Sequence, residues 1–187
     1  MAGPTEILII ADDSADPALI ATDLLGQAEH GPDSPAWLVT TSEAMGKSVA
    51  AEIELQLETL PTAEIASVAW RDNGEIVVVD SDEEAVAVSD EYAPEHLEVM
   101  TRRLDFYLSK LRNYGSLFLG EECTVAYGDK GVGTNHTLPT RSAARYTGGL
   151  WAGKFIKTVT YQHLTPEASR RIAPIMGRVC HVEGMLA

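Results

Sequence analysis

Residues 7–11 read ILIIA, a continuous apolar run rich in β-branched residues, and polar residues follow at once at positions 12–14. An apolar run of this length predicts a strand that is buried on both faces of a sheet. Asp16 and Pro17 then supply a helix N-cap and a first helical position, and apolar residues recur at helical spacing toward Gly31. A buried strand leading into a helix is the repeating unit of a parallel α/β sheet.

The same alternation continues along the chain. Further strands are predicted at residues 37–41, 76–80 and 116–119, and a helix is predicted from about residue 42 to residue 60, where Pro61 ends it. Acidic residues at 82–84 open another helix, where they favour the helix dipole. The fold class predicted is therefore α/β, a Rossmann-like partial parallel sheet covered by helices.

The periodic pattern is lost in residues 127–149, and a loop of this length inside a domain is usually functional. Thr165 and Pro166 start another helix that continues toward the end of the chain. We expect an α/β domain over residues 3–150, followed over residues 151–187 by a linker and a helical tail that acts as a separate docking element. The abrupt ends of the sequence suggest a piece of a longer protein.

The composition is that of a globular domain, with 45% hydrophobic and 22% charged residues in a chain of 187. A formal net charge of −14 repels phosphate and anionic lipid surfaces, which argues against nucleic-acid and membrane roles. Cys123 and Cys180 lie far apart without a CxxC pattern, and no secretory leader is apparent. A reduced cytoplasm is the expected compartment.

Two polar clusters suggest a metal site. Gln27 and His30 are three residues apart, so on a helix their side chains share one face and an amide oxygen and an imidazole nitrogen can reach one ion. Asp129 lies in a glycine-rich loop where backbone and ligand can approach closely. Each has a simpler interpretation: His30 as a surface group near a helix end, and Asp129 as a turn residue.

A third cluster suggests proton transfer, because a histidine beside a carboxylate is suited to it near neutral pH. Glu95 and His96 follow Pro94 in a segment that we interpret as an acidic, exposed helix. Adjacent residues of a helix do not face each other, so a joint role requires an irregular turn or a helix start. Two solvated side chains are the alternative, and His136 could equally be a structural hydrogen-bonding residue.

Four motifs occur in an order that resembles the histidinol dehydrogenase family: GPTE (3–6), QAEHGP (27–32), APEHLE (93–98) and GTNHTLPT (133–140). The resemblance runs over essentially the whole chain and covers the C-terminal portion of a family member. It implies oxidation of an alcohol, L-histidinol in histidine biosynthesis, to a carboxylic acid in two NAD-dependent steps. The site implied is zinc-dependent and lies within a homodimer.

The resemblance also assigns roles to individual residues. It implies Gln27, His30 and Asp129 as zinc ligands, and Glu95 and His96 as the acid/base pair. The residues implied to contact substrate are Thr5, Gln27, His30, His96, Asp129, His136 and Glu183. No GxGxxG or Walker motif is present, so no residue is assigned to NAD. The family's fourth ligand, a histidine, would fall just beyond Ala187, and we expect the chain alone not to turn over substrate.

The sequence allows an alternative substrate and an alternative class of function. Thr5 replaces a more common serine, and GGLWAGKF (148–155) is similar to the branch that resembles sulfopropanediol dehydrogenase, so a small sulfonated diol is the alternative to histidinol. A catalytically silent fragment that binds metal or dimerises is the alternative from another class. If the zinc site forms, its residues should meet at the carboxyl edge of the sheet, where the loops of parallel strands gather.

Overall fold

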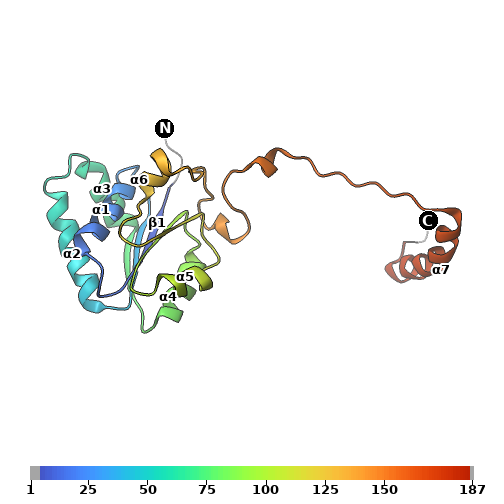
Figure 1. Cartoon of the computed structure of the whole chain (residues 1–187), viewed down its shortest axis with the longest axis horizontal. Coiled ribbons are helices and arrows are strands. Elements are labelled where there is room, and N and C mark those ends of the chain that lie inside the picture. Colours follow the sequence, from blue (N-terminus) through green and yellow to red (C-terminus); the bar gives the residue numbers. More distant parts are fainter. Residues whose placement is uncertain (1–4, 186–187) are drawn as a thin grey trace. The chain divides into compact units, whose positions relative to one another are not determined.

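The computed structural model describes residues 5–185, and a parallel five-stranded sheet forms the centre of its N-terminal unit (Figure 1). The strand order is β3-β2-β1-β4-β5, and each neighbouring pair is parallel. The strands are β1 (Ile7–Ala11), β2 (Ala36–Thr40), β3 (Gly74–Val78), β4 (His96–Met100) and β5 (Ser116–Leu119). The predicted parallel α/β fold is confirmed, with all five residues of β1 buried.

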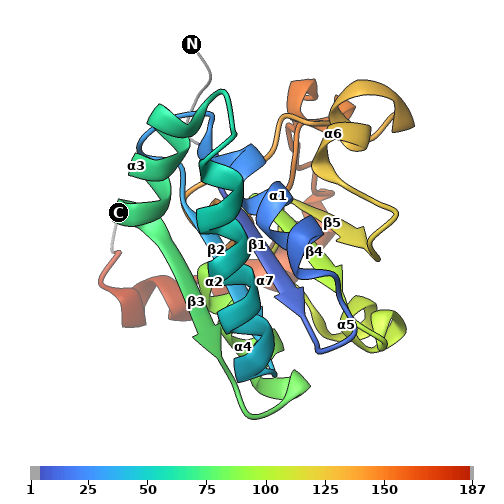
Figure 2. The ribbon, with the colours of Figure 1, turned by 90° about the vertical axis from the view of Figure 1, so that its left-hand side faces the viewer.

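Helices cover both faces of the sheet. Helices α1, α2 and α3 lie on one face, where α1 and α2 stand in front of the strands in Figure 2, and α4 and α5 lie on the other. The helices are α1 (Pro17–Ala28), α2 (Glu43–Leu57), α3 (Ala63–Asn73), α4 (Asp82–Tyr92), α5 (Leu104–Lys110), the single turn α6 (Val125–Tyr127) and α7 (Pro166–Glu183). The alternating side chains of β1 therefore serve two apolar cores, Ile7 and Ile9 facing α1 and Leu8 and Ile10 the opposite layer.

The sequence interpretation of residues 95–98 as an exposed acidic helix is wrong. Helix α4 ends at Tyr92, Ala93 adopts a left-handed conformation with φ 50°, and β4 begins at His96. Strand β4 pairs with β1 in the middle of the sheet, and all five of its residues are buried. Charged side chains obscured a strand whose alternating residues Leu97 and Val99 belong to the core.

Two helices are also absent from the sequence prediction. The helix expected to run to residue 60 ends at Leu57, and a separate helix, α3, follows before β3. Helix α5, of seven residues, connects β4 to β5. These helices lengthen the crossovers between strands but leave the parallel order of the sheet as the alternation predicts.

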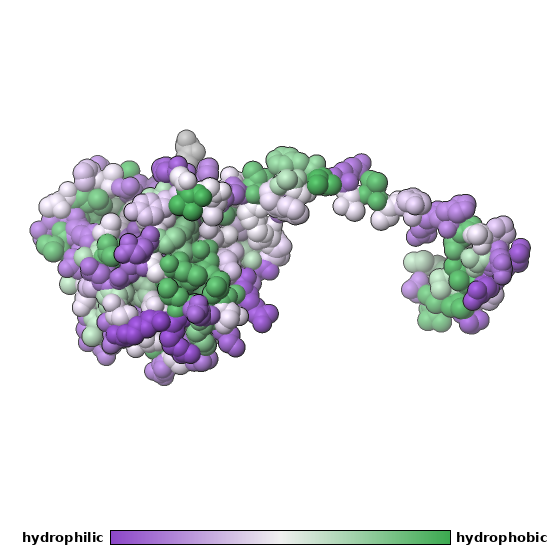
Figure 3. Space-filling view, viewed as in Figure 1, coloured by the Kyte–Doolittle hydropathy of each residue, from purple (hydrophilic) through white to green (hydrophobic). Residues whose placement is uncertain are grey.

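The chain divides into two compact units, Met1–Trp151 and Ala152–Ala187. In the second unit, Thr165 caps α7 by accepting a hydrogen bond from the Ala168 N–H, as the sequence suggests. Apolar side chains of α7 stay in contact with solvent, and Figure 3 shows hydrophobic residues on the surface of this helix. Within residues 5–185, no helix combines the length and the apolar character needed to cross a membrane.

Candidate active site

The site lies where strands β1 and β4 begin. Thr5 and Glu6 precede β1, Glu95 precedes β4, and the two strands are paired with Ile7 opposite His96. Helix α1 brings the chain back to this edge, so that Gln27 in its last turn lies beside Thr5. The expectation that the site would form at the carboxyl edge is therefore wrong, because the helix end and the strand starts supply its residues.

Glu95 and His96 are both held by the backbone of Glu6. The Glu95 carboxylate accepts hydrogen bonds from the Glu6 N–H, at 3.2 Å, and from the Thr5 hydroxyl, at 2.7 Å. His96 Nδ1 lies 3.0 Å from the Glu6 carbonyl oxygen, which only accepts, so Nδ1 carries the proton. The neutral His96 ring then has an unprotonated Nε2.

Burial shifts the pKa of both groups toward their neutral forms. Burial raises the pKa of Glu95, although the hydrogen bonds from Thr5 and Glu6 oppose this shift. Burial lowers the pKa of His96, while the Glu6 carbonyl opposes the shift. A neutral imidazole at physiological pH can accept a proton, and a carboxyl group of raised pKa is a stronger base once it is ionised.

The three predicted zinc ligands line one cavity of about 330 Å³. Gln27 lies in the last turn of α1, His30 lies two residues beyond the end of that helix, and Asp129 comes from the π-helical turn Gly128–Val132 that follows α6. The complete lining is Asp23, Gly26, Gln27, Glu29, His30, Thr124, Val125, Ala126, Asp129 and Lys130. The three side chains therefore line the same cavity, although about a hundred residues separate Gln27 from Asp129 in the sequence.

The donor atoms of the three residues fit a zinc ion. His30 Nδ1 lies 3.0 Å from the Gly26 carbonyl oxygen, which fixes the proton on Nδ1 and leaves Nε2 free to bind a metal. The Gln27 amide nitrogen donates to Thr5, which leaves the amide oxygen free. Imidazole nitrogen and amide and carboxylate oxygens are ligands that zinc accepts, and three protein ligands leave a position open for substrate.

The set of ligands available to a zinc ion in this cavity is restricted. Across the described part of the chain, no group of three or more His, Cys, Asp or Glu side chains is arranged to hold a metal ion. The trio contains only two such residues, and its third donor is the Gln27 amide. A zinc ion here would therefore depend on the amide oxygen, which gives Gln27 the same importance as His30 and Asp129.

A chain of hydrogen bonds joins the cavity to the acid/base pair. The Gln27 amide donates to the Thr5 hydroxyl, and this hydroxyl donates to the Glu95 carboxylate. The charges of Asp129 and His30 also act on the pKa of both Glu95 and His96. The predicted metal ligands and the predicted proton-transferring pair therefore form one polar site.

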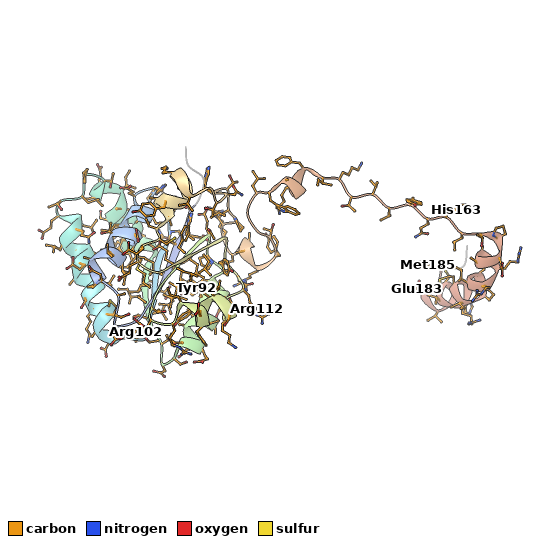
Figure 4. The ribbon with its side chains drawn as sticks, in the orientation of Figure 1. Tyr92, Arg102, Arg112, His163, Glu183 and Met185 are labelled. Carbon is orange, nitrogen blue, oxygen red and sulfur yellow. The ribbon has the colours of Figure 1, made fainter. Side chains whose placement is uncertain are left out.

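Four of the predicted substrate residues, Thr5, His96, His136 and Glu183, are not part of the cavity lining, and the last two also lie outside the hydrogen-bonded chain described above. His136 is exposed in the loop that follows Gly133, where the Asn135 amide donates to the Thr137 carbonyl oxygen at 3.2 Å. Glu183 is the last residue of α7 in the second unit (Figure 4). His163 lies in the extended segment before α7 and is exposed (Figure 4).

Sequence reasoning missed buried carboxyl groups near the site. Asp23 lines the cavity. Glu6, which immediately precedes β1, and Glu98, which lies within β4, are buried. Asp23 could have been found from its helical spacing to Gln27, which places the two on one face of α1. Glu98 became recognisable only once β4 was known to be a strand, where it shares a face with His96.

Comparison with known proteins identifies the family behind this site. The sequence profile of the family described as histidinol dehydrogenase matches residues 1–187. The chain belongs to the histidinol dehydrogenase family. A crystal structure of histidinol dehydrogenase from Elizabethkingia anophelis is similar, with a TM-score of 0.82 and 41% identity, over 98% of this chain and 42% of that one.

Curated relatives differ in name within the family. A "histidinol dehydrogenase homolog" of Shouchella clausii is 59% identical over 99% of this chain and 44% of its own length. The sulfopropanediol 3-dehydrogenase of Ruegeria pomeroyi is 50% identical over 99% and 43%, and the histidinol dehydrogenase of Cereibacter sphaeroides is 42% identical over 100% and 43%. The chain thus spans less than half the length of these relatives.

Proposed function

We propose that this chain carries the metal-binding and proton-transferring residues of a zinc-dependent, NAD-linked dehydrogenase that oxidises an alcohol to a carboxylic acid. The observation that supports this most is the hydrogen-bonded path from Gln27 through Thr5 to Glu95. It connects a candidate metal ligand with a buried carboxylate next to a buried histidine. A silent metal-binding fragment would have no need of a buried acid/base pair beside its metal ligands.

In this proposal the zinc ion would be held by Gln27 Oε1, His30 Nε2 and the Asp129 carboxylate. When bound, it would supply Lewis acidity to the reacting oxygen of the substrate. Gln27 and His30 are oriented for this task by their other hydrogen bonds, to Thr5 and to the Gly26 carbonyl oxygen. Such outer contacts fix the tautomer and direction of metal ligands.

The proton transfers belong to His96 and Glu95. His96 Nε2 would take the proton of the alcohol. Nδ1 already carries a proton, which it donates to the Glu6 carbonyl, and the neutral ring has its free lone pair on Nε2. Glu95 would activate the water that attacks the aldehyde, a role suited to a carboxylate whose pKa burial raises. NAD would accept the hydride in each oxidation, and we assign none of the present residues to it.

Two alcohols are candidate substrates. L-Histidinol is the substrate that the family name implies, and a small sulfonated propanediol is the second candidate. Identity to the sulfopropanediol 3-dehydrogenase, 50%, exceeds identity to the histidinol dehydrogenase of Cereibacter sphaeroides, 42%, which favours the diol. Neither figure identifies the substrate-contacting groups, so the choice requires a direct comparison of the two compounds.

The partner that we propose is a second copy of the chain. Apolar residues of α7 are substantially exposed, among them Ile175 and Met176 at 48% each and Val179 at 45%. Their spacing places them on one side of the helix, and an apolar stripe of this kind normally packs against protein. A homodimer in which α7 contributes to the interface would cover it.

The proposed function is tested by offering both alcohols to the full-length protein that corresponds to its relatives. NADH formation is measured with histidinol and with a sulfonated propanediol under the same conditions, with zinc present. The proposal predicts that one of the two is oxidised and that His96→Ala abolishes most of the rate. NADH formation with neither alcohol would favour the silent-fragment interpretation.

A further inference from the structure

Beneath the cavity, two carboxyl side chains from different elements meet in the core. Glu98 of β4 lies opposite Ile9 of β1, so its side chain shares the face of the sheet that packs on α1. Asp23 of α1 approaches it from that helix, so the two carboxyl groups lie close enough to act on each other's pKa. Glu98 is only 1% exposed, and Asp23 lines the cavity above it.

A proton on one of the two groups favours this approach, because two ionised carboxylates repel each other and neither can donate a hydrogen bond. Glu98 Oε1 accepts from the Val125 N–H at 3.3 Å, and across residues 5–185 no N–H or hydroxyl group donates to the buried Oε2. A proton on Oε2 would be donated to Asp23. Burial, and then the neighbouring Asp23 carboxylate, raises the pKa of Glu98 to about 9, in agreement with a protonated group.

The pair holds the segment that leads to Asp129. The Thr124 hydroxyl donates to Asp23 Oδ1 at 3.1 Å, and the next residue, Val125, donates its N–H to Glu98. Helix α6 and the turn Gly128–Val132 continue directly from these two residues. Two consecutive residues are thus attached to two neighbouring carboxyl groups, five residues or fewer before a candidate metal ligand.

We propose that Asp23 and Glu98 are positioning residues, whose carboxyl groups hold Thr124 and Val125 and thereby fix residues 124–129 so that the Asp129 carboxylate is held at the cavity. The role toward the metal rests on the proposed function, whereas the attachment of residues 124–129 does not. A glutamine at position 98 reproduces the protonated carboxyl, because its amide donates to Asp23 and its oxygen accepts from Val125. A leucine fills the buried space but offers neither contact.

The test uses the 187-residue chain with the variants Glu98→Gln and Glu98→Leu. Hydrogen exchange of the amides at 124–129 should accelerate by about tenfold or more in Glu98→Leu and stay within about twofold of the original chain in Glu98→Gln. Thr124→Val, which removes only the hydroxyl bond to Asp23, should accelerate exchange by a smaller factor. This second variant keeps the test valid if the leucine variant does not fold.

Zinc affinity, measured with Zn²⁺ alone against a competing chelator, should fall by about tenfold or more in Glu98→Leu and be preserved in Glu98→Gln. Unchanged exchange in both Glu98→Leu and Thr124→Val would overturn the proposal, as would an equal acceleration in the glutamine and leucine variants. If the unaltered chain binds no zinc while exchange responds as expected, the proposed metal function fails and the positioning of residues 124–129 stands.

Discussion

The Thr5 hydroxyl donates a 2.7 Å hydrogen bond to the Glu95 carboxylate, although the two residues are 90 positions apart in the sequence. The pairing of β1 with β4 makes this contact possible, because both residues lie at the start of those neighbouring strands. The same hydroxyl accepts a hydrogen bond from Gln27. Thr5 therefore orients a candidate metal ligand and a candidate catalytic base at once.

Thr5→Val should remove both contacts, because valine preserves the shape of the side chain but lacks the hydroxyl. We expect a loss of about 1–3 kcal/mol in the free energy of unfolding, because the buried Gln27 amide and Glu95 carboxylate each lose a partner. The free energy is measured by urea unfolding. Thr5→Ser is the matched control, since it retains the hydroxyl, and a loss as large as that of the valine variant would show that the methyl group matters instead.

His96 and Glu95 should affect different steps in the full-length protein. His96→Ala should slow oxidation of the alcohol by about 10²–10⁴-fold, because proton removal from the alcohol loses its acceptor. Glu95→Gln should slow conversion of the aldehyde to the acid more than it slows oxidation of the alcohol, since only the second step requires an activated water. The two rates are measured by supplying the alcohol and the aldehyde separately. Unaltered conversion of aldehyde by Glu95→Gln would remove Glu95 from the mechanism.

Glu98 should make the folded protein less stable as pH rises. Its pKa of about 9 in the folded state exceeds the value of about 4.3 for an exposed glutamate, so between these values only the folded protein retains the proton. The stability contributed by that proton is complete below the lower value and is lost as pH rises toward the upper one, by at most about 1.4 kcal/mol per pH unit. Asp23 is the acidic group in contact with Glu98, and burial raises its pKa as well.

Unfolding by urea at about pH 5, 7 and 9 measures this dependence. The slope should be much smaller in Glu98→Gln, which cannot ionise, and the remaining slope reports Asp23 and other groups. An identical slope in the original chain and in this variant would mean that Glu98 is ionised in the folded state.

Helix α7 provides a prediction about assembly. Replacing Ile175 and Val179 together by glutamate should shift the chain toward monomer, because two charges would enter the proposed apolar interface. Sedimentation velocity measures the distribution of species. Arg170→Glu is the control, since helical spacing places Arg170 on the opposite side of α7. A chain that is monomeric before any change would contradict the proposed homodimer.

The sequence predicts those parts of the fold in which the local pattern and the buried environment agree. Strand β1 is recognisable because its apolar run matches its burial on both faces. Strand β4 is equally buried, but His96 and Glu98 interrupt its apolar pattern. Their hydrogen-bond partners are distant in sequence, the Glu6 carbonyl for His96 and the Val125 N–H for Glu98, and local patterns carry no information about such partners.

In the candidate site, too, features set by the local sequence pattern were predictable, and features set by packing between elements were not. The spacing of Gln27 and His30 correctly predicts that both face one cavity, because helical periodicity is a local property. The edge of the sheet was predicted wrongly, because the site is built from the end of α1 and the starts of β1 and β4 rather than from loops after the strands. Such an arrangement depends on packing between elements, which single-sequence periodicity does not encode.

Zinc binding by the metal-free chain tests the central claim most directly. The chain is treated with a chelator, titrated with Zn²⁺, and the bound metal is measured after dialysis, in parallel with His30→Ala and with His163→Ala as a matched histidine outside the site. We predict stoichiometric zinc in the original chain and in His163→Ala, and loss of stoichiometric binding in His30→Ala. Equal zinc content in all three proteins, or none in the original chain, would contradict a zinc site formed by Gln27, His30 and Asp129.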